Sequence, residues 1–298
     1  MRVNPDYMTD LVGSLDATSS SEAQLTEELA SGSQVNSLSD NPLAAGENVL
    51  LSAQIAGDDS FSQSASSTQS MLQVSDSALG TVVSQITSAI SLATEANNGT
   101  LNASDVQSIS NQLAGIRDEV VSMANTTYLG QYVFSGSQGG TAPYTLNTAT
   151  SPATATYNGD SDVEYLQTPN GQKIQLNIPG SQIFSAAGSN VLGTLNQLVS
   201  DFASGTPSAT AMADTEALGT ALGYVSQQRV LIDNSISRLT AAETYTQSEG
   251  TQLQSVQTNL LQADVGQIAT QLSSAETQQA ALSQVIATLG KQSLFNDL

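Results

Sequence analysis

Two long stretches of helical periodicity constrain the fold of this chain more than any other feature. In each stretch, apolar residues recur at intervals of three and four positions, which is the spacing of one face of an α-helix. The first stretch begins at Pro42 and ends at Asn97-Asn98-Gly99, and the second runs from Pro207 to Gln262. A helix over 207–262 would be about 80 Å long at about 1.5 Å per residue. Because a globular domain does not accommodate such a helix, the pattern predicts a rod of paired helices.

A further helix is expected at each end of the chain, separated from the long helices by a short break. At the N-terminus, Asn4-Pro5 is a helix start signal, and the segment SGSQVNSLSDNPLAAG at 31–46 interrupts the helix before Asn41-Pro42 repeats that signal. At the other end, Ala263–Gly266 forms a weak break, and Gly290 is the expected stop. The two stripes consist of Met8, Leu11, Leu15, Thr18, Glu22, Leu25 and Leu29, and of Ile268, Leu272, Ala275, Gln279, Leu282, Ile286 and Leu289.

Between the long stretches lie a third amphipathic helix and a segment of different character. Ser104 and Gln107 have the spacing of a capping box, and the helix behind it is expected to pack on its predecessor as a hairpin. Residues 128–188 are rich in aromatic residues and proline, and Pro169-Asn170-Gly171 between two β-like runs indicates a hairpin. A short helix near 190–202 is expected to return the chain. The middle of the sequence therefore predicts a small β-rich insert.

The composition excludes several classes of function. The 298 residues carry a formal charge of −21, which argues against nucleic acid and anionic membranes as partners. With no His and no Cys, the commonest general base, the thiol nucleophile and nearly all zinc sites are absent, so we expect neither an enzyme nor a metal or cofactor site. The N-terminus lacks the apolar core of a secretory signal, and no window is apolar enough to span a membrane.

The C-terminal helix has few charges for a helix exposed to water. Across 251–290 the charged residues are Asp264 and Glu276. A thin apolar stripe with uncharged polar flanks gives a helix that is only marginally stable alone, and a neighbour could cover it at a small desolvation cost. We therefore expect the terminal helices to be mobile in the monomer and to pair into a coiled coil inside a polymer. An ordinary bundle within one chain is the alternative that periodicity leaves open.

Several segments resemble the flagellin superfamily, and within it the hook-associated protein 3 group at the junction of flagellar hook and filament. The similarity rests on the MRV start, on ELASGSQVNSLSDNPLAAG at 28–46, on NGTLNASDVQSISNQLAGIRDEVVSMANTTYLGQYVFSG at 98–136 followed by TAPY, and on QAALSQVIATLGKQSLFNDL at 279–298. QQRVLIDNSISRL at 227–239 is similar to both the junction group and filament flagellin. One difference is Gly266, where relatives often carry an acidic residue.

The resemblance implies a mainly α fold, an elongated flagellin-like bundle or coiled coil of N- and C-terminal helices with a small β-rich inserted domain. It implies that 1–39 and 263–298 form an inner coiled-coil layer, that 40–140 and 189–262 form a helical rod, and that 141–188 lies outside. It also implies secretion to the flagellum through the type III channel without a cleaved signal peptide. The implied partners are further copies in a ring, another hook-associated protein on the hook side, flagellin on the filament side, and a cytoplasmic export chaperone on the C-terminal helix.

We therefore predict that the protein is a structural adaptor that transmits torque through helix packing. The residues expected to form assembly contacts are Met8, Leu11, Leu15, Leu25, Ile268, Leu272, Leu282, Ile286 and Leu289. The alternatives are a short filament flagellin, a surface-displayed adhesion module on 141–188, and, most remotely, a secreted hydrolase that uses Ser and carboxylates.

Three other features have a functional and a structural interpretation. Asp160, Asp162 and Glu164 have the alternate spacing of a calcium loop, but Gly171 stands where the bidentate Glu would fall, which favours exposed loop charge. The glycine-rich GSQGG at 136–140 lacks the Lys-Ser/Thr pair of a phosphate loop, so a flexible turn is expected. Arg229 lies on the seam of the long helix, where it is expected to extend its stem along the seam rather than pair with a carboxylate.

Overall fold

The computed structural model describes residues 5–294 and divides the chain into two compact units. Unit 1 combines Met1–Gly57 with Ser248–Leu298, and unit 2 is Asp58–Gln247. We describe each unit by itself. The start signal at Asn4 lies outside the described residues.

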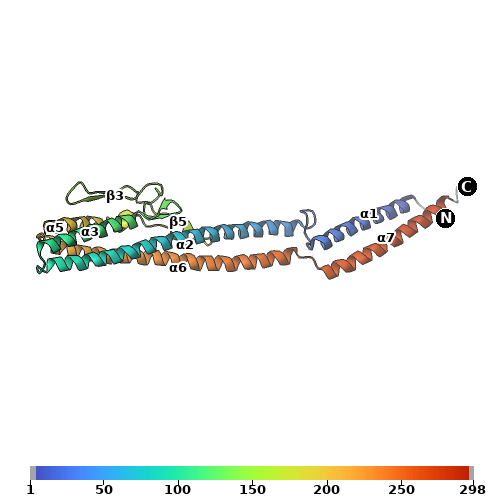
Figure 1. The fold of residues 1–298 in the computed structure, drawn as a ribbon. Helices are drawn as coiled ribbons and strands as arrows, with labels where there is room; N and C mark the ends of the chain where they lie inside the picture. The colour runs from blue at the N-terminus through green and yellow to red at the C-terminus, as the bar shows by residue number, and fades with distance from the viewer. Residues whose placement is uncertain (1–4, 295–298) are drawn as a thin grey trace. The chain divides into compact units, whose positions relative to one another are not determined.

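The fold is mainly helical, as the sequence predicts, and each of the two long stretches contains one long helix (Figure 1). The second helix begins at Ala211 instead of Pro207. Asn41 accepts a hydrogen bond from the Ala44 backbone N–H at 3.1 Å, which caps the first long helix. That helix ends at Asn97, and Gly99 then adopts a φ of +69°. The helices are α1 (Pro5–Ser31), α2 (Pro42–Asn97), α3 (Ala103–Ala124), α4 (Gly180–Ile183), α5 (Val191–Phe202), α6 (Ala211–Leu261) and α7 (Val265–Leu294).

Over residues 5–294, the strands form three separate antiparallel hairpins. The hairpin expected at Pro169-Asn170-Gly171 is confirmed, and Gly171 takes the positive φ of +84° that its turn requires. The small strand-containing insert of the predicted fold class is therefore present. The pairs are β1 (Thr127–Tyr128) with β2 (Gln131–Tyr132), β3 (Tyr144–Asn147) with β4 (Thr154–Tyr157), and β5 (Tyr165–Gln167) with β6 (Lys173–Gln175).

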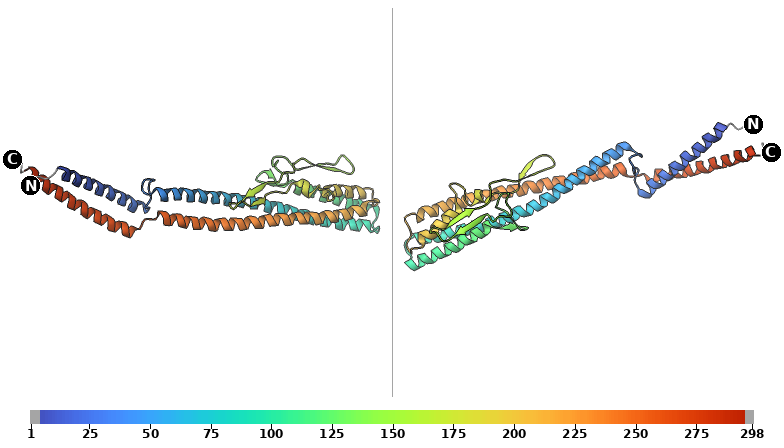
Figure 2. Two further views of the ribbon diagram at one scale, coloured as in Figure 1. Left: turned by 180° about the vertical axis from the view of Figure 1, so that it is seen from behind. Right: turned by 90° about the horizontal axis from the view of Figure 1, so that it is seen from above.

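Unit 2 holds the buried core. α3 runs back along α2 and contacts α5, and the hairpins lie on one side of these helices (Figures 1 and 2). Phe134 and Phe184 meet edge to face with ring centroids 5.5 Å apart, which joins the segment after β2 to the end of α4. The helices contribute aliphatic side chains, among them Leu79, Val82, Ile86, Leu113, Val120, Leu195, Leu218 and Val225.

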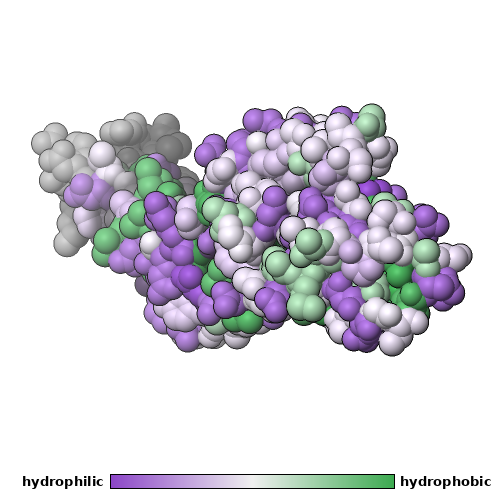
Figure 3. All heavy atoms as spheres, turned by 90° about the vertical axis from the view of Figure 1, so that its left-hand side faces the viewer, coloured by the Kyte–Doolittle hydropathy of each residue, from purple (hydrophilic) through white to green (hydrophobic). Residues whose placement is uncertain are grey.

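Seen end-on, the surface nearest the viewer is mostly polar, with apolar residues in separate groups (Figure 3).

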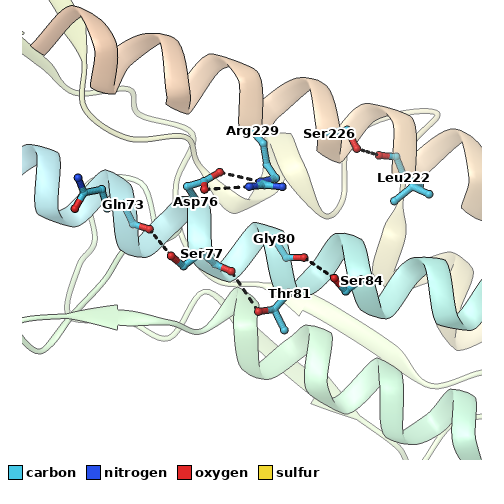
Figure 4. Close-up of polar contacts among 9 residues, drawn as sticks. All are labelled: Gln73, Asp76, Ser77, Gly80, Thr81, Ser84, Leu222, Ser226 and Arg229. Atoms are coloured by element: carbon cyan, nitrogen blue, oxygen red, sulfur yellow. Dashed lines mark hydrogen bonds and ion pairs between the residues drawn. The ribbon is translucent and has the colours of Figure 1, made fainter. Parts of the chain in front are cut away.

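Inside unit 2, α2 and α6 are joined along their length by polar contacts between facing side chains. The Gln69 amide donates to the Thr240 hydroxyl at 3.0 Å, and the Asn97 amide donates to the Thr215 hydroxyl at 3.1 Å. Arg229 makes the strongest of these contacts, because its Nε and Nη2 donate to the two carboxylate oxygens of Asp76 at 2.8 and 3.0 Å (Figure 4). This pairing raises the pKa of Arg229.

Three local expectations are wrong. Arg229 pairs with a carboxylate on the neighbouring helix instead of only extending its stem, because Asp76 lies opposite it on α2. The cap of α3 is Asn102, whose side-chain oxygen accepts from the Asp105 N–H at 2.9 Å, so Ser104 and Gln107 do not form a capping box. Gly290 lies within α7 and does not end it, since glycine can adopt helical dihedral angles at a small cost.

Candidate assembly surface

The terminal helices α1 and α7 pack against each other within unit 1. The less exposed face of each helix coincides with the predicted stripe, apart from Leu29, which is 37% exposed. The residues expected to make assembly contacts all lie on these two faces: Met8, Leu11, Leu15, Leu25, Ile268, Leu272, Leu282, Ile286 and Leu289. One chain therefore brings all of them to the seam between α1 and α7.

This seam is only partly covered by a single chain. In α1, no side chain from Tyr7 onward is buried, and in α7 as far as Leu289 only Ile268 and Ala275 are, at 5% and 8% exposure. In unit 2, by contrast, many core side chains are completely buried. A pair of helices that retains so much exposure along its apolar stripe gains little from hydrophobic burial.

Further apolar side chains in unit 1 point into solvent. Four of them lie close together in the sequence at the start of α2 and in the segment before it. They are Leu38, Leu43, Val49 and Leu50, with exposed fractions of 69, 73, 65 and 72%. On the terminal helices, Tyr7, Val12, Val265 and Val285 are also exposed. Exposed apolar residues in such number are typical of surfaces that become covered on association.

The two breaks beside the terminal helices are bonded to each other. Ser33 and Gln262 form an antiparallel bridge, the Gln34 N–H donates to the Leu261 carbonyl at 2.8 Å, and the Ala263 N–H donates to the Gly32 carbonyl at 3.0 Å. The Gln34 side chain adds a bond to the Leu260 carbonyl at 2.7 Å. The breaks are therefore held together by backbone bonds that satisfy groups at the ends of both helices.

Each break also contains an aspartate whose side chain accepts hydrogen bonds from nearby backbone N–H groups. Asp40 accepts bonds from the Ser37 hydroxyl and from the Ser37 and Asn36 backbone N–H groups, and the bonds from Ser37 lower the pKa of Asp40. Asp264 accepts from the Gly266 and Gln267 N–H groups at 3.0 and 3.1 Å, which caps α7. A Cβ on Gly266 would meet only the Asp264 Oδ1 at 3.4 Å, so that position has room for a side chain.

The acidic loop of unit 2, residues 160–164, is held in a turn by hydrogen bonds to Asp160. Asp160 accepts bonds from the Ser137 hydroxyl and N–H and from the Asp162 N–H, and the bonds from Ser137 lower its pKa. Over residues 5–294, no group of three or more His, Cys, Asp or Glu is arranged to hold a metal ion. Over the same residues, no helix has the length and apolarity needed to cross a membrane.

Sequence reasoning placed the stripes but missed the contacts between segments. The bridge between the breaks joins Ser33 to Gln262, and no local pattern marks that pairing. Asp76 as the partner of Arg229 was missed for the same reason. The cap at Asp264 could have been found, because Asp is a preferred N-cap residue and Asp264 directly precedes the start of α7.

The N-terminal part of this chain is similar to a known protein family. Residues 9–139 match the family described as the bacterial flagellin N-terminal helical region. Together with the fold, this match confirms the resemblance to the flagellin superfamily.

The similarity extends to one group within that class. The chain is 30% identical over 200 residues to flagellar hook-associated protein 3 of Salmonella typhimurium, covering 64% of this chain and 59% of the relative. It is 30% identical over 171 residues to the protein of that name from Escherichia coli, covering 56% and 51%. The aligned part thus spans less than two thirds of each curated relative.

Solved structures show the same fold. A structure described as a putative flagellar hook-associated protein from Vibrio parahaemolyticus matches with a TM-score of 0.66 at 21% identity, covering 75% of this chain and 100% of that one. A flagellar hook-associated protein 3 from Legionella pneumophila matches with a TM-score of 0.62 at 14% identity, covering 71% and 98%.

Proposed function

We propose that this protein is a structural adaptor of the bacterial flagellum that joins the hook to the flagellin filament. It acts by helix packing and self-assembly rather than by catalysis. The observation that carries the proposal is the seam of α1 and α7, whose apolar stripe is only partly buried in one chain. The similarity to two hook-associated proteins 3 supports the junction over a filament subunit.

In this proposal the chain is organised in layers. Residues 1–39 and 263–298 form the inner layer, 40–140 and 189–262 form the rod, and 141–188 faces outward. The bonded breaks at Gln34 and Ala263 connect the inner layer to the rod. Copies of the chain pack their terminal pairs side by side, so that each seam is covered by its neighbours.

The partners follow from the position at the junction. The chain assembles into a ring between another hook-associated protein on the hook side and flagellin on the filament side. It reaches that place through the flagellar type III system without a cleaved signal peptide. Before export, a cytoplasmic chaperone covers the apolar stripe of α7, which is the face that would otherwise associate too early.

An assembly assay tests the proposal. Purified protein is added to isolated hooks in the presence of the hook-side partner, and the hook ends are observed by electron microscopy. We expect growth to stop after a short ring that then accepts flagellin. Growth without limit would show a filament flagellin instead, and no binding to hook ends would overturn the proposal.

A further inference from the structure

A pocket in unit 2 lies between the turn of the β5–β6 hairpin and one face of α6. Its volume is about 290 Å³. The polar residues that line it are Thr168, Asn170 and Gln172 from the hairpin turn, and Arg238, Tyr245 and Thr246 from α6. A volume at the lower end of the range for ligand sites fits a molecule of only a few heavy atoms.

Arg238 gives the pocket its charge. Its Nη2 donates to the Lys173 carbonyl at 3.0 Å, which ties the guanidinium to strand β6 and leaves its other N–H groups available. Within the described part of the chain, Arg117 and Arg229 are paired with Asp118 and Asp76, at 2.7 and 2.8 Å.

Neither Arg238 nor Lys173 has a carboxylate within ion-pair distance among the described residues. Lys173 contributes its backbone carbonyl to this contact, and Arg238 is the charged residue that lines the pocket. In a protein of net charge −21, a guanidinium that lines a pocket and has no carboxylate partner favours an anionic ligand.

The remaining polar groups of the pocket are suited to an acceptor-rich ligand. The Asn170 side-chain oxygen already accepts a bond from the Thr168 hydroxyl, so the rest of that amide is a donor. Thr246 is 1% exposed and its hydroxyl has no hydrogen-bond partner, whereas the hydroxyls of Thr240 and Thr244 bond to carbonyls four residues earlier. A buried hydroxyl without a partner is costly unless a ligand satisfies it.

We infer that this pocket binds the carboxylate group of a small organic acid. Arg238 holds the carboxylate through two parallel N–H bonds, the geometry in which a guanidinium recognises this group. Asn170 and Gln172 donate to the remaining oxygen positions, and Pro169, Ala241 and Ala242 contact the carbon chain. The site is separate from the terminal helices and does not depend on the proposed function.

Arginine side-chain resonances provide a direct test. The arginines are Arg2, Arg117, Arg229 and Arg238, so their Nε–H signals form a sparse and assignable spectrum. Full-length labelled protein is titrated with succinate, and sodium chloride of matched ionic strength serves as the control. We expect a saturable shift of the Arg238 signal and none of the Arg229 signal, which is already paired with Asp76.

Two variants and a second probe sharpen this test. Arg238→Gln should abolish the saturable binding, and Arg238→Lys, which keeps the charge but loses the planar fork, should weaken it at least about tenfold.

The second probe is N-acetylglutamate methylamide, which presents an acidic side chain. Binding of succinate alone assigns the site to a free acid, and equal binding assigns it to any carboxylate of this size. A linear shift like that caused by chloride, or unchanged binding by Arg238→Gln, would overturn the inference.

Discussion

At the scale of single residues, the charged groups of unit 2 connect one helix to another. Arg229 on α6 binds both oxygens of Asp76 on α2, with side-chain exposures of 33 and 24%. Asp201 on α5 is buried, and its Oδ1 accepts bonds from Gln197 and Thr210. Asp214 on α6 lies near Asp201, and burial together with this second carboxylate raises the pKa of Asp214. Because such contacts are directional, they fix the register of helices that apolar seams alone would allow to slide.

Removing the Arg229–Asp76 pair should have a measurable but moderate cost. We expect Arg229→Leu to lower the free energy of unfolding by about 1 kcal/mol, since the pair is bidentate but partly open to solvent. A double-mutant cycle with Asp76→Asn, followed by chemical denaturation, measures the coupling. A coupling energy indistinguishable from zero would mean that the pair does not hold the two helices in register.

The Asp201–Asp214 pair should make stability depend on pH. Burial raises the pKa of Asp214 above its ordinary value of 3.8, and the neighbouring Asp201 carboxyl group adds to this effect. The folded chain therefore keeps a proton that the unfolded chain has lost, so the contribution of this group is full below that ordinary value and is lost as the pH rises through the raised pKa.

The variant Asp214→Asn tests this dependence. Compared with the wild type, it should lose less stability as the pH rises from acidic to neutral, because the amide has no proton to release. Denaturation midpoints measured across that range give the difference. Glu216→Gln, at an exposed position two residues further along α6, is the matched control and should follow the wild type.

At the scale of elements, the terminal pair and the bundle of unit 2 differ in how fully they bury their apolar faces. α3 buries Val106, Ile109, Leu113 and Val120, whereas α1 buries none of its stripe residues completely. Helix propensity and caps therefore contribute a larger share of the stability of α1 and α7 than of the stability of α3.

Hydrogen exchange should separate these elements. In dilute protein we expect weak protection of the amides of α1 and α7 and strong protection of α3 and of α2 within unit 2, because local opening costs less where fewer apolar contacts are lost. The measurement is exchange detected by mass spectrometry at low protein concentration. Strong protection of residues 5–30 under these conditions would show that the terminal pair is stable without neighbours.

The cap of α7 gives a second prediction at this scale. Asp264→Ala removes the acceptor for the Gly266 and Gln267 N–H groups and should destabilise the start of α7 by about 1 kcal/mol. Faster exchange of the first turn of α7 is the readout. Gln267→Ala, which leaves the cap in place, should exchange at the wild-type rate, and the same acceleration in both variants would argue against the cap.

At the scale of the whole molecule, the two units should unfold separately. Unit 2 contains the aromatic contacts of Phe134, Phe184 and Tyr144, and among the described residues the only tyrosine of unit 1 is Tyr7. We expect far-ultraviolet circular dichroism to fall in two steps on heating, and the near-ultraviolet aromatic signal to follow only the second step. A single transition seen by both signals would contradict this prediction.

Local patterns in the sequence predict the helices and the faces on which they pack. The stripe from Met8 to Leu25 and that from Ile268 to Leu289 are visible because the helical period repeats many times, and the caps at Asn41 and Gly99 are local signals. The hairpin at Gly171 has the same origin, since its turn needs a residue that tolerates a positive φ.

Which segments meet is visible only in the folded chain. The bridge from Ser33 to Gln262, the pairing of Arg229 with Asp76, and the pocket formed by Arg238 with the hairpin turn all join residues far apart in the chain. Periodicity shows which face of a helix is apolar, but it carries no information on the register between two helices. That register is set by the sum of many weak contacts across the seam, and it exists only once the chain has folded.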